Sequence, residues 1–142
     1  MVLGVIFLIL IIVCGAFFTV MFVQQRMEKG SIEKSVDHYY ELYNTQNFES
    51  IYNDLGNEEL RSSVTFEEFE KIMTTFHQKL GNYKSRHEGI WRMNYTTGGR
   101  YFLIQYPSLF DSGEASDSFT LKKERDVWRL VGYHTNSKAL LG

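Results

Sequence analysis

The chain has 142 residues, which leaves room for one ordinary domain and excludes a two-domain enzyme. Its formal net charge of -2 removes the electrostatic case for nucleic acid as a partner, because nucleic-acid-binding domains are usually strongly basic. The single cysteine, Cys14, excludes an intrachain disulfide and a thiolate metal cluster, so packing alone must hold the fold.

The first element is a long apolar run. Residues 2–23 contain no charged side chain, and sixteen of them are Leu, Ile, Val or Phe. An apolar run of more than about 18 residues is typical of a membrane-spanning helix. A cleaved signal peptide would need a basic start, a shorter apolar stretch and a small-residue cleavage site. Val13 before Cys14 argues against a lipoprotein signal. We therefore predict a transmembrane helix over residues 1–23.

A short polar linker, residues 24–30, joins this helix to residues 31–142, which we call the body. The linker is too short to let the body move far from the bilayer. The basic residues Arg26, Lys29 and Lys34 follow the apolar run and none precedes it, so the positive-inside rule places the body in the cytoplasm. The charge difference is small, and this rule alone leaves the orientation open.

Three helices are predicted in the first half of the body. The first follows Ser31 as its N-cap, and a short second helix follows Asn47. The third begins at Thr65, which forms a capping box with Glu68, and it stops at Gly81. The apolar positions at helical spacing are Ile32, Val36, Tyr39, Tyr40, Tyr43, Phe48, Ile51, Tyr52, Leu55, Phe66, Phe69, Ile72, Met73, Phe76 and Leu80.

After Gly81 the apolar pattern changes to period two, which predicts four antiparallel strands. Turn signals at Gly98-Gly99, residues 111–113 and Arg125-Asp126 separate them. A two-residue turn at Gly98-Gly99 pairs Tyr95 with Phe102, and it gives one apolar face and one face shared by Arg92 and Gln105.

The turn at Arg125-Asp126 can hold two or four residues. A two-residue turn sets Leu121 opposite Leu130, and a four-residue turn sets Leu121 opposite Trp128. Both keep one apolar face of Phe119, Leu121, Trp128 and Leu130, whereas a three-residue turn splits that face and is rejected. Helices followed by an antiparallel meander predict an α+β domain whose long helix packs on the concave face of a curved sheet.

The order of elements resembles the cystatin-like, nuclear-transport-factor-2-like superfamily, and in particular its small bacterial membrane-anchored members of unknown function. The resemblance covers residues 31–137 and rests on Tyr39–Asn44, Asn47–Tyr52, Thr65–Phe69, Lys79–Gly81 and Val127–Tyr133. It implies a cone of three helices on a four-stranded sheet. It also implies an exported body at the bacterial cytoplasmic membrane. These are core and turn residues, so they say more about fold than about chemistry.

Enzymatic members of such a group place an Asp or His inside the cone, so we consider Asp117 and His134 as candidates. With a two-residue turn at Arg125-Asp126 the two face each other at the end of the apolar face, where the carboxylate could orient the imidazole. With a four-residue turn the two residues no longer face each other. The plainer interpretation is that both are surface residues near strand ends. Tyr39 is the third candidate for a ligand cavity, although aromatic residues at helical spacing usually form core.

The sequence offers no motif for a metal or a cofactor. Its histidines, His38, His77, His87 and His134, lack the spacing of metal ligands. Gly98-Gly99 precedes a strand rather than the helix that a phosphate-binding loop requires. We therefore expect no metal ion and no cofactor.

Two functions are compatible with these features. The first is a membrane-anchored, non-enzymatic binding or assembly module whose partner is another envelope protein or a second copy of the chain. The second is a small lyase, isomerase or hydrolase that uses the His/Asp pair. A ligand-sized pocket beside a buried acid would favour the enzyme, and a cone filled by Trp91, Trp128 and Phe76 would favour the module.

Overall fold

The computed structural model describes residues 1–141, and the chain divides at Glu33/Lys34 into two units. Helix α1 runs without interruption from Val2 to Asn44. Its apolar part has a mean hydropathy of 3.0 over 18 residues, and none of that stretch is buried. The helix is thus long and apolar enough to cross a membrane. The expected linker, residues 24–30, is helical, and Ser31 lies inside α1 rather than capping a new helix, which corrects that prediction.

The second unit begins with the last turns of α1 and three short helical segments. Helix α2, Phe48–Ser50, is capped by Asn47 as predicted, and it continues as a π-helical turn, η1, over Ile51–Leu55. Helix α3, Glu58–Ser63, was not predicted. Its cap is Asn57, whose side chain accepts a hydrogen bond from the Leu60 backbone N–H at 3.1 Å.

Helix α4, Phe66–Leu80, is the third predicted helix, and its limits are confirmed. The Glu68 backbone N–H donates to Oγ1 of Thr65 at 3.3 Å, and the Thr65 N–H donates to Oε2 of Glu68 at 3.2 Å. This reciprocal pair satisfies two N–H groups that have no partner within the helix. At the other end Gly81 adopts φ 76° and ψ -157°, and its N–H donates to the His77 carbonyl.

Replacing Gly81 by alanine should destabilise the second unit by about 1–3 kcal/mol, because that backbone region is open almost only to glycine. A Cβ there would also lie 2.6 Å from Cβ of Asp111. Urea unfolding of the full chain in detergent micelles measures the effect. Gly132→Ala is the matched control, because a Cβ at Gly132 meets nothing within 4 Å. Equal stabilities of the two variants would contradict the argument.

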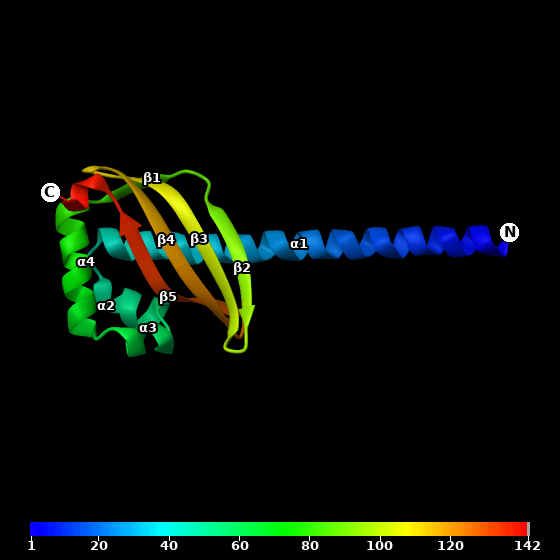
Figure 1. The fold of residues 1–142 in the computed structure, drawn as a ribbon, viewed down its shortest axis with the longest axis horizontal. Coiled ribbons are helices and arrows are strands. Elements are labelled where there is room, and N and C mark those ends of the chain that lie inside the picture. The colour runs from blue at the N-terminus through cyan, green and yellow to red at the C-terminus, as the bar shows by residue number, and fades with distance from the viewer. Residues whose placement is uncertain (142) are drawn as a thin grey trace. The chain divides into compact units, whose positions relative to one another are not determined.

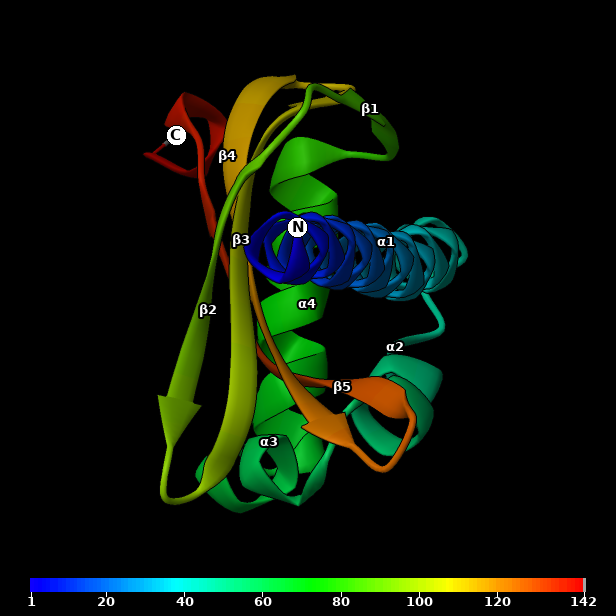
Figure 2. The same ribbon diagram turned by 90° about the vertical axis from the view of Figure 1, so that its right-hand side faces the viewer.

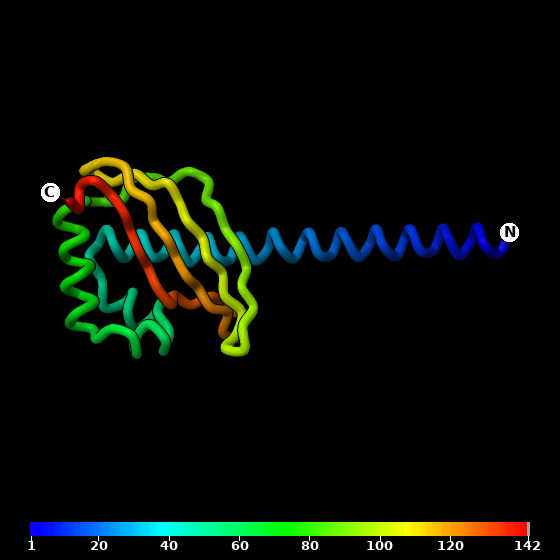
Figure 3. The backbone as a smooth tube through the Cα atoms, in the orientation of Figure 1, coloured from blue at the N-terminus to red at the C-terminus, as the bar shows by residue number. Residues whose placement is uncertain are grey.

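Five antiparallel strands follow, one more than predicted (Figure 1). They are β1 Tyr83–Arg86, β2 Ile90–Thr96, β3 Gly99–Phe110, β4 Gly113–Glu124 and β5 Val127–Asn136, and the chain then enters a 3-10 turn, η2, over Lys138–Leu141. Strands β1 and β2 both pair with β3, one after the other along the same edge, and β4 and β5 complete the sheet. In the backbone trace of Figure 3, the chain runs from β1 into β2 along this one edge of the sheet. The period-two pattern after Gly81 predicted a single strand where the structure has the two short strands β1 and β2.

The register of the β2–β3 hairpin differs from the prediction by two residues. Met93, rather than Tyr95, lies opposite Phe102, and Thr96 lies opposite Gly99. The two-residue turn is therefore Thr97-Gly98. A shift of two residues leaves every side chain on its predicted face, so Arg92 and Gln105 still share the outer face.

The β4–β5 hairpin has the two-residue turn at Arg125-Asp126. Leu121 lies opposite Leu130, and Lys123 lies opposite Trp128, as one of the two predicted registers requires. Between Thr120 and Leu121 the register then shifts, so that Thr120 lies opposite Gly132. Strand β5 therefore has one extra residue, a β-bulge, and every later side chain of β5 changes face.

We call the face of the sheet covered by helices the inner face and the opposite one the outer face. Helix α4 and the last turns of α1 lie on the inner face (Figure 2). There Phe76 of α4 contacts Tyr133, and the hydroxyl of Tyr40 of α1 donates a hydrogen bond to Asp117. Asn44 ties the end of α1 to β1 through both backbone groups of Tyr83. The predicted apolar face of Phe119, Leu121, Trp128 and Leu130 is buried there.

Candidate functional site

Asp117, one of the three candidates from the sequence, lies on the inner face of β4 and is 0% exposed. Its Oδ2 accepts a hydrogen bond from the Tyr40 hydroxyl at 2.5 Å, and its Oδ1 accepts one from Oγ1 of Thr135 at 2.6 Å. A carboxylate buried away from water requires such donors, and these charge-assisted hydrogen bonds are short. Helix α1 and strand β5 are thus both hydrogen-bonded to this one acidic side chain of β4.

Burial is the main influence on this acid and raises the pKa of Asp117 above its ordinary value of 3.8, although the bonds from Thr135 and Tyr40 lower it in part. Burial and the nearby carboxylate raise the pKa of Tyr40 as well. The arrangement therefore favours the neutral hydroxyl of Tyr40, and Asp117 holds its proton more tightly than an aspartic acid exposed to water does.

Tyr39, the second candidate, belongs to the same buried group. Its ring centroid lies 4.6 Å from that of Tyr133 and 5.0 Å from that of Phe119. Its hydroxyl reaches Sδ of Met73 on α4 at 3.9 Å. We call Asp117, Thr135, Tyr39, Tyr40 and Tyr133 the Asp117 cluster. Aromatic rings fill the space around the acid, and its zero exposure leaves no room for a water-sized molecule beside it.

His134, the third candidate, does not face Asp117, which corrects that predicted pair. The bulge sets Thr135 opposite Asp117 and His134 opposite Ser118. His134 is consequently exposed on the outer face. The turn was one of the two predicted, and a single extra residue in β5 separated the acid from the imidazole. Whether any of the three candidates binds a ligand stays a prediction.

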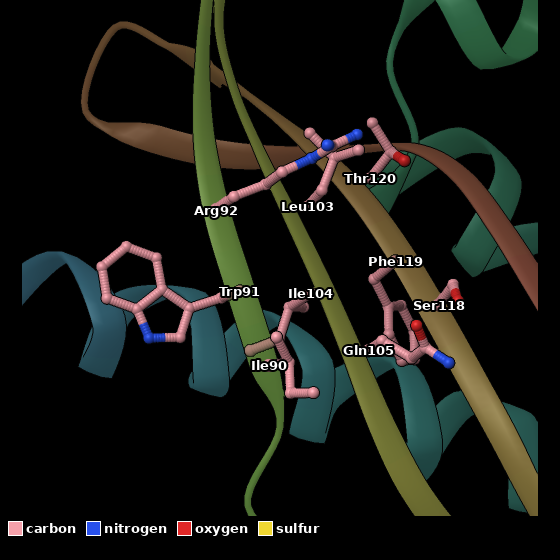
Figure 4. A pocket seen from close by; sticks show the side chains of 9 residues that line it. All are labelled: Ile90, Trp91, Arg92, Leu103, Ile104, Gln105, Ser118, Phe119 and Thr120. Atoms are coloured by element: carbon pink, nitrogen blue, oxygen red, sulfur yellow. The ribbon is translucent and has the colours of Figure 1, made fainter.

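The sheet carries a hollow of about 250 Å³ across β2, β3 and β4 (Figure 4). In the figure the Arg92 side chain extends past Leu103 toward Thr120, while Trp91 points the other way. The residues lining this outer hollow, as we call it, are Ile90, Trp91, Arg92, Leu103, Ile104, Gln105, Ser118, Phe119 and Thr120.

The register explains which side chains gather at the outer hollow. Gln105 lies opposite Ser118, and Ser118 lies opposite His134, so one polar row crosses β3, β4 and β5. Nε2 of Gln105 donates to Oγ of Ser116 at 2.6 Å. The neighbouring row runs through Thr120 to Gly132, where a Cβ would meet nothing within 4 Å and the surface is open.

The outer hollow combines a guanidinium, an amide and two hydroxyls with apolar side chains. These groups can donate hydrogen bonds to carbonyl or carboxylate oxygens of a bound segment. The sequence placed Arg92 and Gln105 on one face but did not reveal the hollow, because Ser118 and Thr120 alternate with apolar residues as in any half-exposed strand. Within residues 1–141 no three His, Cys, Asp or Glu side chains are placed to hold a metal ion.

The fold and these two sites define a class: an α+β domain with a packed interior and a polar outer hollow, in a chain that also carries an apolar helix of membrane-spanning length. Residues 35–133 match the family described as "protein of unknown function (DUF4019)". The match covers more than half of the chain, which therefore belongs to this family. No curated protein matches the sequence.

Proposed function

We propose that the protein is a membrane-anchored, non-enzymatic binding or assembly module that holds a partner on the outer face of its sheet. The observation that carries this proposal is the contrast between the two faces. The inner face is filled by aromatic side chains around a fully buried Asp117, whereas the outer face has a hollow lined with hydrogen-bond donors. The partner is another envelope protein that offers carbonyl or carboxylate oxygens.

The fold within this proposal is the cone of the cystatin-like, nuclear-transport-factor-2-like superfamily, with its interior closed. The order of helices before an antiparallel sheet supports it. Trp128 is buried and Phe76 contacts Tyr133, as a filled cone requires. Trp91 stacks on the buried ring of Phe102 but stays 40% exposed, so it fills the interior only in part.

The alternative, an enzyme in the cone, has one observation in its favour, the raised pKa of the buried Asp117. Acid–base catalysis also needs the substrate within hydrogen-bond reach of the acid. Asp117 has no exposed surface, and the imidazole proposed as its companion lies on the other face. The binding module is therefore the better-supported function.

The anchor in this proposal is the apolar part of α1, in a bacterial cytoplasmic membrane with the second unit on the extracytoplasmic side. The length and hydropathy of α1 support the anchor, and the superfamily resemblance supports the orientation. Carbonate washing of membranes should leave the chain in the pellet, because raising the pH does not displace an apolar span. Protease added to cells with a permeabilised outer membrane should digest the second unit. Digestion only after lysis would reverse the orientation.

Site-specific crosslinking tests the binding surface. A photoreactive amino acid at Gln105, which lines the outer hollow, should give a discrete adduct of higher mass in membranes. The same group at Glu70, exposed on α4, should not. Ser118→Tyr, which fills the hollow, should abolish the Gln105 adduct, and Glu70→Tyr should leave it unchanged. An adduct that survives Ser118→Tyr, or equal adducts from both positions, would contradict the proposed surface.

A further inference from the structure

The edge strand β2 exposes an unusual set of side chains. Ile90 is 82% exposed, Tyr95 68% and Trp91 40%, so three of the seven residues of this strand place large apolar or aromatic surface in solvent. The other exposed large apolar residues of the second unit, such as Ile72 on α4, lie singly on separate elements. Single exposed apolar residues are ordinary, whereas these three gather along one strand, with Trp91 and Tyr95 on one face of β2 and Ile90 on the other. Such a gathering is typical of an interaction surface.

The backbone of β2 limits what this surface can contact. Strand β2 pairs with β3 and, in the described part of the chain, with no other strand. N–H and C=O groups along its free edge therefore need water or another hydrogen-bonding partner. The hydrocarbon core of a bilayer would leave them unsatisfied, but the headgroup region contains water and polar groups. The strand suits the interfacial depth of a membrane.

The side chains and charges fit that depth. Trp and Tyr are enriched at membrane interfaces, where an apolar ring and a polar group meet different surroundings. The guanidinium of Arg100 lies 5.4 Å from the centroid of the Tyr95 ring. Residues 89–110 contain two arginines and no acidic residue. Such a surface is attracted to anionic lipid headgroups.

Chain connectivity keeps a bilayer within reach. Residues 24–33 join the apolar run to the second unit, and even fully extended they would span only about 35 Å. A weak affinity for lipid is then sufficient, because the tether supplies a high effective concentration of membrane.

We propose that the free edge of β2, with Trp91 and Tyr95, docks on the anionic headgroup surface of the membrane that α1 spans. This inference rests on the proposed anchor. Docking fixes one edge of the sheet at the bilayer and leaves β3 and β4, which carry most of the outer hollow, available to a partner.

Tryptophan quenching tests the docking, because the chain has two tryptophans and Trp128 is buried. The full chain is reconstituted in vesicles of phosphatidylcholine and phosphatidylglycerol that carry bromines on the acyl chains near the headgroups. The Trp91 emission is the difference between the wild-type chain and Trp91→Phe. This emission should be roughly one half lower in the brominated vesicles than in vesicles of the same lipids without bromine, because interfacial side chains lie about 5–10 Å deep, within reach of the bromines.

Two variants separate docking from other causes. Tyr95→Glu should restore the Trp91 emission, because it places a negative charge against anionic headgroups, and the matched variant Ile72→Glu should leave the quenching unchanged. Quenching by aqueous acrylamide alone would show that the edge faces water. Protection from both quenchers would show that a peptide or a second copy covers it, and either result overturns the proposal. A chain that floats with the vesicles but is not quenched overturns docking alone, whereas a chain that fails to float overturns the anchor as well.

Discussion

Replacing Asp117 by alanine is expected to destabilise the second unit by about 2–4 kcal/mol. The substitution leaves the hydroxyls of Tyr40 and Thr135 without their acceptor, and an unsatisfied buried group costs about 1–3 kcal/mol. Relief from burying a charge offsets part of that cost. Urea unfolding of the full chain in detergent micelles, followed by tryptophan fluorescence, measures the change. A loss below about 0.5 kcal/mol, the range of ordinary surface substitutions, would mean that Asp117 is not buried as described.

The pH dependence of this effect has a defined sign. Because the pKa of Asp117 is raised on folding, the folded state binds the proton more tightly than the unfolded state. Asp117 therefore contributes its full stabilisation below pH 3.8, the ordinary pKa of this group. That contribution is lost as the pH rises through the raised pKa of Asp117 in the folded protein. The wild-type chain should thus gain stability over Asp117→Asn as the pH falls through this window. A constant difference between the two, or one of opposite sign, would contradict the assignment.

Trp128→Ala should cost about 3–5 kcal/mol, the usual penalty for truncating a large buried aromatic residue. Trp128 is 2% exposed, and its ring lies 5.9 Å from that of Phe102. The loss is a large share of the roughly 5–15 kcal/mol that stabilises a typical domain. Circular dichroism during thermal and urea unfolding checks it, since the variant loses a tryptophan signal.

Trp91→Ala is the control for Trp128→Ala. Trp91 stacks on Phe102 with a centroid distance of 5.1 Å but remains 40% exposed, so its removal should cost less than half as much. A cost under about 1 kcal/mol for Trp128→Ala, or equal costs for the two variants, would contradict the burial that the structure gives these side chains.

Local signals in the sequence predicted the parts of the fold that depend on local physics. The Thr65/Glu68 capping box and Gly81 defined α4, because both ends are set by residues within one or two turns. The alternation of Phe119, Leu121, Trp128 and Leu130 predicted the buried face, because period two has a single solution when one face must leave water. Helix α3 was missed because it spans only Glu58–Ser63 and has little apolar periodicity.

The candidate site depended on long-range register, which the sequence does not encode locally. Both predicted turns for β4–β5 assumed an unbroken ladder, and nothing in Leu130–Val131–Gly132 requires an extra residue there. The bulge moved His134 outward and brought Thr135 to Asp117. The outer hollow was missed because its lining combines three strands whose alignment became known only from the structure.

The bulge in β5 also makes this strand sensitive to length rather than to identity. Inserting one residue between Gly132 and His134, with the bulge kept, would set His134 opposite Asp117 and Thr135 opposite Ser116, so an imidazole would replace a hydroxyl beside the buried acid. Deleting the extra residue of the bulge would instead restore an unbroken ladder and leave Thr135 opposite Asp117. Inserting or deleting two residues would preserve the inward positions. Beyond the bulge, many side chains of this strand can therefore vary, but an insertion must add residues in pairs if each later side chain is to stay on its face of the sheet.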